Sequence, residues 1–441
     1  MFLPEYVTQA LDRLENAGFA AYAVGGCVRD SVLGLTPHDY DLCTAAKPET
    51  IKELFSDRPL VLAGEKHGTI SVVTDAGLLE ITTFRTEGSY HDNRHPDWVE
   101  FVDEIEGDLA RRDFTVNAMA YSPKRGFADP FGGRQDLKDH VLRAVGDPRT
   151  RFREDSLRIL RGVRFAVRYG LTPEVQTEQA MVSLAPLMDN LARERVFDEL
   201  CKLLVTVTPA DILRFAPILI QPLPELAPTV GFDQHSVHHA YDVFTHTAQV
   251  TGSVAPILPL RWAALLHDCG KPGVFTMDAE GHGHFFGHAA ESARLADAAL
   301  RRLKAPTALR ERAVFLIEKH MTPLEPDRKL LRRRLSQYGE EPLRQLLMLQ
   351  QADFGSKGVT GESPRFEEIP ALLEKILGES ACLTVKDLAV SGRDLMALGL
   401  QGRQIGQTLD TLLSRVLDEK LPNEKEALRK AAEELQAGDG H

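Results

Sequence analysis

Two aspartates one residue apart, Asp39 and Asp41, are the side chains in this sequence best spaced for metal-assisted chemistry. In a β-strand, residues i and i+2 project from the same face, so both carboxylates are expected in one site. Two like charges so close repel each other unless a cation lies between them, and carboxylate oxygens suit Mg²⁺. Two such ions about 3.5–4 Å apart can clamp the attacking and leaving oxygens of a phosphoryl transfer. Taken alone, such a pair is usually only a solvated strand edge.

The residues around this pair favour a triphosphate as the ligand. Gly26 belongs to a double-glycine turn between an apolar strand and a helix start, where the backbone can approach phosphate oxygens closely. Arg29 adds a charged donor for the same group. With this turn upstream, we predict that Asp39 and Asp41 are catalytic Mg²⁺ ligands. Glu80 is either a third carboxylate facing the site or a cross-strand partner of a nearby arginine.

The block RRDFTVNAM carries side chains suited to the sugar of a nucleotide. Asp113 and Asn117 are four residues apart and lie on one side if this turn is helical, where they can hydrogen-bond a ribose hydroxyl. Arg112 would reach a phosphate. A capped helix start with a surface salt bridge is the alternative for this block.

The basic segment REDSLRILRGVRF is predicted to select the base. Asp155, Arg158, Arg161 and Arg164 recur at helical spacing and are expected on one helix face. Cytosine and adenine both present an amino donor beside a ring-nitrogen acceptor, whereas uracil and guanine present a carbonyl beside an N–H donor. An aspartate that accepts and an arginine that donates therefore match C and A, and a mispaired buried charge rejects U and G. The alternative is an intrahelical ion pair worth ~0.2–0.5 kcal/mol.

A second constellation, of histidines and aspartates, lies in the C-terminal half. An adjacent His–Asp pair with a histidine upstream and an aspartate well downstream resembles the ligand pattern of HD-family phosphohydrolases. Imidazole with carboxylate suits Mn, Ni, Fe or Zn better than Mg, and such a metal would activate water against a phosphoester. The alternative is a degenerate domain that serves only as a scaffold. The candidate ligands are His246, His267, Asp268, His288, His320 and Asp353.

The charge distribution favours a polyanionic partner although the net charge is −12. The segment 111–170 has fourteen Lys/Arg against seven Asp/Glu, and the segment 301–340 has eleven against five. Such zones suit a localised nucleic-acid footprint, with solvated basic helix faces as the alternative. The five cysteines lack paired spacing, and no signal peptide or membrane span is apparent. We therefore expect a cytoplasmic protein.

The elements that must position these residues change character along the chain. Strand-like and helix-like segments alternate up to Leu142, with a polar loop at 88–98, and helical periodicity dominates afterwards. The expected fold class is an α+β N-terminal nucleotidyltransferase head with a small mixed sheet, followed by mostly α-helical domains. The predicted domains are the head at 1–142, a helical neck with the base-selecting helix at 143–215, an HD-like helical domain at 216–370 and a helical tail at 371–441.

Five motifs occur in the order and approximate spacing of a known family: GGCVRD, DYD, RRDFTVNAM, DPFGGRQDL and EDSLRILRGVRFA. Here the chain resembles bacterial class II CCA-adding enzymes, the tRNA nucleotidyltransferases, and bacterial poly(A) polymerases share the head motifs. The resemblance implies a polymerase-β-like head with Asp39 and Asp41 as metal ligands, and a tail that grips tRNA. It also implies that the loop at 88–98 takes part in switching from C to A addition. The implied nucleotide contacts come from Gly26, Arg29, Arg112, Asp155, Arg158, Arg161 and Arg164.

The expected function is template-independent addition of CCA to tRNA 3′ ends, with CTP and ATP as substrates and Mg²⁺ in the head. The resemblance to members with an HD domain adds a phosphohydrolase activity on RNA ends. The first alternative is a poly(A) polymerase or a CC- or A-only adding enzyme. The second is an HD phosphohydrolase whose head only binds RNA. No membrane partner is expected, and the oligomeric state is left open.

Overall fold

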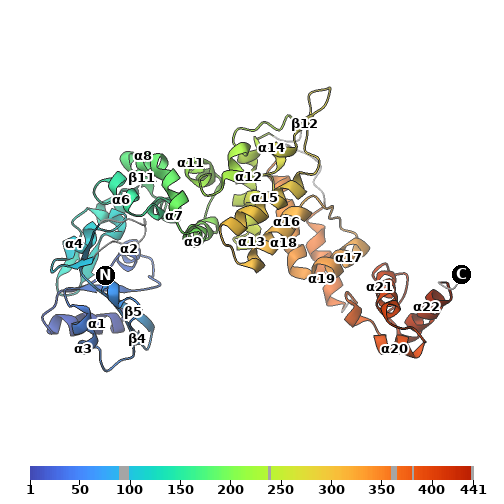
Figure 1. Cartoon of the computed structure of the whole chain (residues 1–441), viewed down its shortest axis with the longest axis horizontal. Helices are drawn as coiled ribbons and strands as arrows, with labels where there is room; N and C mark the ends of the chain where they lie inside the picture. The colour runs from blue at the N-terminus through green and yellow to red at the C-terminus, as the bar shows by residue number, and fades with distance from the viewer. Residues whose placement is uncertain (89–98, 237–239, 359–364, 380–381, 439–441) are drawn as a thin grey trace. The chain divides into compact units, whose positions relative to one another are not determined.

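The computed structural model describes residues 1–441 except 89–98, 237–239, 359–364, 380–381 and 439–441 (Figure 1). The chain forms two compact units. The first comprises Met1–Pro224 with Arg302–Ala305, and the second comprises Glu225–Arg301 with Pro306–His441. The finer division into four domains stays a prediction. The segment expected to switch base addition falls, from residue 89 onward, outside the described residues.

A mixed seven-stranded sheet forms the centre of the first unit. The strand β2 (Asp41–Thr44) pairs antiparallel with β1 (Ala21–Val24) and parallel with β5 (Gly77–Thr83). These short apolar strands lie in the middle of the sheet, where β1 is wholly buried. The sheet order is β3-β4-β5-β2-β1-β8-β9, completed by β3 (Leu60–Val61), β4 (Thr69–Thr74), β8 (Ala120–Ser122) and β9 (Gly126–Ala128). Asp41 is therefore the first residue of a central strand.

The segments between the strands supply the helices of the head. The helix α1 (Glu5–Asn16) buries Val7, Leu11 and Leu14, which recur at helical spacing. A core cluster that includes Tyr22 fills the sheet face near α4 (Ile105–Ala110). The other elements are α2 (Gly26–Val32), α3 (Pro48–Leu54), η1 (Glu65–His67), η2 (Thr115–Asn117), α5 (Gly133–Lys138) and the hairpin of β6 (Arg85–Glu87) with β7 (Val99–Phe101).

A helical layer completes the first unit. The helix α6 (Pro148–Glu154) begins at Asp147, whose carboxylate caps it by accepting from backbone N–H groups. The helix α7 (Leu157–Tyr169) follows and ends at Gly170, which closes it with a left-handed φ of 61°. The remaining elements are β10 (Val141–Leu142), β11 (Thr172–Pro173), α8 (Val175–Leu184), η3 (Ala185–Asn190), α9 (Arg193–Leu204), α10 (Pro209–Arg214) and α11 (Ala216–Leu219).

The second unit is almost entirely helical, with one short hairpin. Its helices are α12 (Val243–Ser253), α13 (Leu258–Leu266), α14 (Lys271–Val274), α15 (His288–Arg302), α16 (Thr307–Lys319), α17 (Arg328–Tyr338), α18 (Glu340–Gly355), α19 (Glu368–Gly378), α20 (Gly392–Ala397), α21 (Arg403–Leu417) and α22 (Lys425–Gly438). The hairpin joins β12 (Thr276–Met277) to β13 (Gly283–His284), and the 3₁₀ turns are η4 (Pro224–Thr229) and η5 (Val385–Asp387). None of the five cysteines forms a disulfide in the described part of the chain. Among the described helices, none is long and apolar enough to cross a membrane.

The basic run on α17 packs against acidic groups of its own unit. Arg328 forms ion pairs with Glu379 and Glu419, and Arg333 donates to Asp418 with Nε 2.7 Å from Oδ1. These arginines therefore join α17 to the segments that follow α19 and α21. The helix does not present a row of unpaired cations, which weakens the interpretation of 301–340 as a nucleic-acid footprint.

Candidate functional site

A cavity of about 440 Å³ in the first unit gathers almost all of the predicted nucleotide-binding residues. Six arginines and three aspartates line it, so its charge suits a polyphosphate. The lining residues are Gly25, Gly26, Arg29, Asp41, Arg111, Arg112, Asp113, Asn117, Asp155, Leu157, Arg158, Arg161, Phe165 and Arg195. Residues from the sheet, from η2 and from α7 and α9 thus meet in one place.

One of the two predicted metal ligands, Asp41, lines this cavity. Asp39 lies just before β2, so strand alternation does not place the two carboxylates on one face as we expected. They still lie close enough to interact. Burial raises the pKa of Asp41, although its side chain reaches solvent, and the charges of Glu80 and Asp39 raise it further. A concentration of negative charge of this kind fits a divalent cation.

Glu80 stands beside this pair. Its Cα is the register partner of Asp41 across the parallel β2–β5 ladder. No ion pair within 4 Å joins the carboxylates of Glu80, Asp39 or Asp41 to another described residue. The three acids also form no group with ligand atoms within 4.8 Å of one another. Glu80 is therefore an electrostatic neighbour of Asp41, and its role as a third ligand stays a prediction.

The glycine turn places a guanidinium over the cavity. Gly25 has a φ of +70°, and a Cβ added there would lie 2.7 Å from Nη1 of Arg112. Arg112 is held by Asp108, with Nη2 3.1 Å from Oδ2, while its Nε is buried without a hydrogen-bond partner among the described atoms. The absence of a side chain at Gly25 is what allows Arg112 to lie against the turn.

A hydrogen-bond network connects three of the predicted motifs. Arg29 donates to the amide oxygen of Asn117, and the amide nitrogen of Asn117 donates to Asp113 across 3.0 Å. Asp113 in turn accepts from Nε of Arg161 at 2.9 Å. Burial by itself would raise the pKa of Asp113, but Arg161 and the amide of Asn117 lower it to about 2. The Asp113–Asn117 spacing thus positions two arginines.

Tyr169 is a member of this network that the sequence did not reveal to us. Its hydroxyl accepts from Arg29, and the Arg29 guanidinium lies 4.2 Å from the centre of the Tyr169 ring. The spacing of Tyr169 from Phe165, one turn of α7, was the available signal. The rings of Tyr169 and Phe165 both lie against the Arg29 guanidinium, 4.2 and 5.3 Å from it.

Asp155 and Arg158 both line the cavity but do not share a helix. Asp155 lies in the break between α6 and α7 with a φ of −140°, so our expectation of a single helix face was wrong in this detail. Its Oδ2 is 2.8 Å from Nη2 of Arg195, a residue of α9 that was not among our predicted residues. Arg158 donates to Oε2 of Glu154 at 2.6 Å. The two predicted base-selecting groups are therefore each held by a separate partner.

Arg164 is the one predicted nucleotide contact that stands apart from the cavity. Its Nε donates to Oε2 of Glu199 at 2.6 Å, and its guanidinium stacks 4.3 Å from the centre of the Phe165 ring. Both charged groups are buried at the α7–α9 contact. The ion pair with Glu199 holds the Arg164 side chain against α9.

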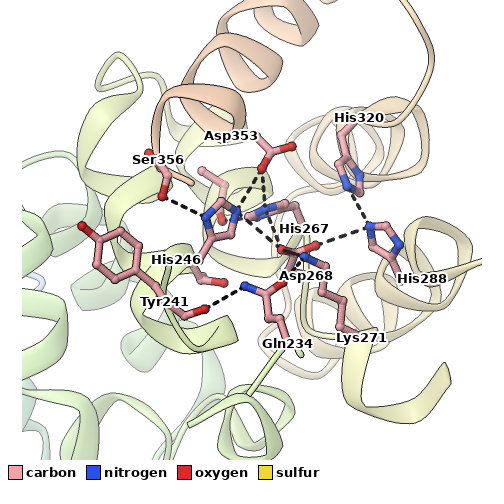
Figure 2. Close-up of polar contacts among 12 residues, drawn as sticks. Gln234, Tyr241, His246, His267, Asp268, Lys271, His288, His320, Asp353 and Ser356 are labelled. Carbon is pink, nitrogen blue, oxygen red and sulfur yellow. Dashed lines mark hydrogen bonds and ion pairs between the residues drawn. The ribbon is translucent and has the colours of Figure 1, made fainter. Parts of the chain in front are cut away.

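The histidine–aspartate residues come together in the second unit, from five helices (Figure 2). His246 lies on α12, His267 and Asp268 end α13, His288 begins α15, His320 ends α16 and Asp353 lies on α18. Two groups of three ligands form: His246 with His267 and Asp268, and Asp268 with His288 and His320. In each group the ligand atoms lie within 4.8 Å of one another. Figure 2 shows His246 with Asp353 on one side of Asp268 and His288 with His320 on the other.

The backbone orients all four imidazoles toward the centre of this cluster. In each ring Nδ1 lies within hydrogen-bond distance of a backbone carbonyl oxygen. The distance is 3.2 Å from His246 to Ser356 and 2.8 Å from His267 to Ala264. It is 2.9 Å from His288 to Phe285 and 2.6 Å from His320 to Ile317. A carbonyl only accepts, so each Nδ1 carries a proton, and Nε2 of a neutral His288 or His320 ring faces inward as an acceptor. Nε2 of His246 instead lies 2.9 Å from Oδ1 of Asp353, a carboxylate oxygen that can only accept.

Two of these acceptors face each other without a proton between them. Nε2 of His288 lies 3.2 Å from Nε2 of His320. Burial lowers the pKa of His288 and lowers that of His320 to about 4, so both rings are neutral at neutral pH. Nε2 of His267 is likewise buried without a hydrogen-bond partner among the described atoms. Inward lone pairs beside the buried Asp268 fit a cation.

Lys271 and Cys269 flank the central aspartate. Nζ of Lys271 lies 2.8 Å from Oδ2 of Asp268 and 2.8 Å from Oε1 of the buried Gln234. Burial by itself would raise the pKa of Asp268, but His267 and Lys271 hold it well below its usual range. Cys269 directs its Sγ toward the carbonyl of Ser292, away from the ligands. Lys271 was not among our predicted residues, although it follows the His–Asp pair by one helical turn.

Comparison with known proteins places the chain in a family. The head matches the model for the poly A polymerase head domain over residues 21–143. A CCA-adding enzyme of Levilactobacillus brevis is 36% identical over 430 residues, which are 97% of this chain and 97% of that protein. The chain belongs to the family of CCA-adding enzymes.

The other matches agree with this membership. A CCA-adding enzyme of Leuconostoc mesenteroides subsp. mesenteroides is 47% identical over 206 residues, 47% of this chain and 51% of that protein. The structure of the Bacillus stearothermophilus CCA-adding enzyme in complex with CTP matches with a TM-score of 0.73 and 27% identity, and covers 99% of both chains. The expected class II CCA-adding enzyme, with a nucleotidyltransferase head of mixed sheet followed by helices, is confirmed. The chain is thus an enzyme of tRNA processing, a nucleotidyltransferase.

Two further family models cover parts of the helical region of this CCA-adding enzyme. The model for a probable RNA and SrmB-binding site of polymerase A matches residues 170–216, and the putative tRNA nucleotidyltransferase domain 2 matches residues 286–432. These models leave 217–285 uncovered, and the histidine–aspartate cluster begins in that segment. The HD domain therefore stays a prediction.

Gly25→Ala is expected to weaken nucleotide binding by this CCA-adding enzyme. The new Cβ would displace the Arg112 guanidinium and force a left-handed backbone that costs about 1–2 kcal/mol in a residue with a side chain. Gly34→Ala is the matched control, because Gly34 has a φ of +73° and no atom within 4 Å of an added Cβ. We expect both variants to lose stability in thermal unfolding and only Gly25→Ala to raise the Kd for CTP in calorimetry. Equal Kd values would contradict the role given to Arg112.

Proposed function

We propose that the first unit adds C, C and A to the 3′ end of tRNA from CTP and ATP and releases pyrophosphate. The observation that carries this proposal is the meeting of Asp41, an arginine-rich lining and the Asp155–Arg158 pair in one cavity. The CTP complex of the Bacillus stearothermophilus relative supports the nucleotide, and the Thermotoga maritima enzyme complexed with tRNA_CCA, 22% identical with a TM-score of 0.60, shares the fold.

Asp39 and Asp41 would hold Mg²⁺, which when bound lowers the pKa of the primer hydroxyl and stabilises charge on the α-phosphate. Arg29 and Arg112 bind the triphosphate, and neither needs to move far to do so because both already line the cavity. Asn117 keeps one amide N–H for a ribose hydroxyl after its bonds to Arg29 and Asp113 are made.

The base is selected by Asp155 and Arg158. In the described state Asp155 bonds Arg195 and Arg158 bonds Glu154, so each must exchange part of that contact for the base. A carboxylate accepts the amino hydrogen of C or A, and a guanidinium donates to the adjacent ring nitrogen. Uracil and guanine would set a carbonyl against the carboxylate, and that repulsion excludes them.

The number of nucleotides added to a tRNA that lacks its terminus distinguishes CCA addition from the related polymerase activities. With CTP alone we expect two additions, with CTP and ATP three, and with ATP alone none. Long A-tails would identify a poly(A) polymerase, and a stop after CC or addition of A only would identify a partial enzyme. No incorporation at all would leave the RNA-binding hydrolase as the remaining alternative.

We further propose that the histidine–aspartate cluster is the HD site of a metal-dependent phosphohydrolase. The inward Nε2 atoms that face each other at 3.2 Å favour it. The cluster would hold Mn, Ni, Fe or Zn, with His246, His267 and Asp268 at one position and Asp268, His288 and His320 at the other. Asp353, whose Oδ1 lies 2.9 Å from Nε2 of His246, would add a carboxylate to the first position. In such a reaction the oxygen of water bonds to phosphorus, the ester P–O bond breaks, and the leaving oxygen takes a proton.

Metal content tests the proposed HD site directly. We expect two Mn²⁺ or Ni²⁺ per chain in the wild type, about one in His320→Ala and none in Asp268→Ala, because Asp268 belongs to both groups. His282→Ala, an exposed histidine of the same unit, should retain both ions. The readout is elemental analysis after dialysis. A wild type that binds no ion, or a His320→Ala variant that keeps two, would contradict the arrangement.

A further inference from the structure

Contacts within the protein engage most of the donors of the Arg29 guanidinium. Its Nε and Nη2 lie 2.8 and 2.7 Å from Oδ1 of Asp30. Its Nη1 donates to the amide oxygen of Asn117, and its Nη2 also donates to the hydroxyl of Tyr169. A guanidinium has five N–H groups, so among the described contacts only the second N–H of Nη1 is left for a ligand. The partners of the other N–H groups therefore decide where this donor points in the cavity that Arg29 lines.

Tyr169 differs from the other partners of Arg29 in its place in the fold. Asp30 follows Arg29 on α2, and Asn117 ends η2, whereas Tyr169 is the last residue of α7. Tyr169 is not among the described residues that line the cavity. It acts on the cavity through Arg29, which it contacts with both its hydroxyl and its ring.

The Tyr169 hydroxyl is suited to orienting a cation that must bind an anion. Burial raises the pKa of Tyr169, so the hydroxyl keeps its proton and is neutral at neutral pH. Unlike the carboxylate of Asp30, a neutral hydroxyl orients the guanidinium of Arg29 without cancelling its charge.

The helix α7 is joined to the head at a second place. Arg161, about two turns before Tyr169, pairs with Asp113, with Nη2 2.7 Å from Oδ2. Asp113 also accepts from the amide nitrogen of Asn117, whose amide oxygen accepts from Arg29. These side chains close a ring that begins and ends on α7. The ring therefore sets the position of Arg29 relative to the helix that contributes Arg161 to the cavity.

We infer that Tyr169 is a positioning residue for the triphosphate, which holds Arg29 at a fixed place relative to α7. The phosphates and the base of one nucleotide are thereby bound at a set separation. The inference rests on the triphosphate role of Arg29 proposed above and adds the residue that aims it. It applies to CTP and ATP alike, because the two nucleotides carry the same triphosphate.

Tyr169→Phe tests the hydrogen bond by itself, because it removes the hydroxyl and keeps the ring. The full-length protein is titrated in a calorimeter with CTP or ATP, in the presence of Mg²⁺ and without tRNA. We expect the Kd for each nucleotide to rise about 5- to 10-fold, as for the loss of one hydrogen bond. Tyr169→Leu, which also removes the ring beside the guanidinium, should raise both Kd values about 2- to 5-fold further.

Cytidine separates a positioning role from a general structural one. It has the base and no phosphate, and its affinity is measured by competition against CTP. We expect Tyr169→Phe to bind cytidine as the wild type does. A loss of cytidine affinity as large as the loss of CTP affinity would show that Tyr169 only supports α7, and would overturn the inference.

Tyr338→Phe is the matched control. The Tyr338 hydroxyl also accepts from an arginine, with Nη1 of Arg334 3.1 Å away and the guanidinium 5.5 Å from the ring centre. This pair lies on α17 in the second unit. We expect Tyr338→Phe to leave the Kd for CTP and for ATP unchanged.

Arg29→Ala separates the failure of this inference from the failure of the proposed role of Arg29. A raised Kd for CTP in Arg29→Ala with an unchanged Kd in Tyr169→Phe would overturn the role of Tyr169 alone. An unchanged Kd for CTP in Arg29→Ala would reject Arg29 as a triphosphate ligand, and the inference with it.

Discussion

Replacing either aspartate proposed to bind Mg²⁺, in Asp39→Ala or Asp41→Ala, is expected to lower nucleotide incorporation by about 10³-fold or more. Each carboxylate would contribute a ligand whose loss removes several kcal/mol of stabilisation of the charge that develops on the phosphate, and each 1.36 kcal/mol is tenfold in rate. The fold should survive, because both side chains reach solvent at the start of β2 and form no ion pair with a described residue. The measurement is incorporation of labelled CTP into a tRNA that lacks its terminus.

Glu80→Gln is the matched control for this prediction. Glu80 is the register partner of Asp41 and raises its pKa, but the three acids form no compact ligand group. We expect incorporation within a few-fold of the wild type at neutral pH. Because the Glu80 charge raises the pKa of Asp41, its removal should let Asp41 stay ionised to a lower pH. Full incorporation of CTP by Asp39→Ala would contradict the proposed metal-assisted mechanism. A loss of incorporation in Glu80→Gln as large as that in Asp41→Ala would identify Glu80 as a metal ligand.

Replacing Asp155 is expected to abolish the discrimination between bases while nucleotide addition itself continues. In Asp155→Ala the acceptor for the amino group of C and A is lost, together with the repulsion that excludes U and G. We expect the preference for CTP over UTP to fall by about 5- to 150-fold, as for the loss of a buried charged partner. Total incorporation should fall much less than in Asp41→Ala, since Asp155 is not among the residues proposed to bind the metal. The measurement is kcat/KM for each nucleotide on the same tRNA.

Asp155→Asn sharpens the test. An amide keeps the volume of the carboxylate and adds an N–H donor that can face the carbonyl of uracil. We therefore expect Asp155→Asn to admit UTP more readily than Asp155→Ala does. Asp189→Ala is the control, because Asp189 also pairs with an arginine of α9 but is 61% exposed in its side chain. If both Asp155 variants kept the wild-type preference, base selection would have to come from other residues.

Much of the head site was readable from the sequence, since it is built from short motifs. The double glycine before a helix, the aspartate pair and the REDSLR segment each carry their chemistry in adjacent residues. All of the predicted nucleotide contacts except Arg164 line one cavity. Arg164 does not line it, because helical periodicity gives a spacing along α7 and does not reveal the neighbour on α9, where Glu199 binds it.

The residues that sequence reasoning missed are partners from distant parts of the chain. Arg195 reaches Asp155 from forty residues away, and Tyr169 reaches Arg29 from 140. No local pattern marks such a partner, because the pair exists only after the helices pack. The same holds for the basic run on α17, whose acidic partners at Asp418 and Glu419 follow it by 85 and 91 residues.

By itself, the sequence determined the chemical kinds of both sites, because residue type and spacing are local properties. The aspartate pair predicts carboxylate chemistry before any fold is known. In the same way, the arginine blocks predict guanidinium chemistry and the His–Asp pattern predicts imidazole chemistry. Only the tertiary structure decided which groups face each other. It placed Asp155 between two helices, closed the Arg29–Asn117–Asp113 network and brought Nε2 of His288 against Nε2 of His320. The physical reason is that pairing across elements depends on packing between them, and packing is not encoded at any single position.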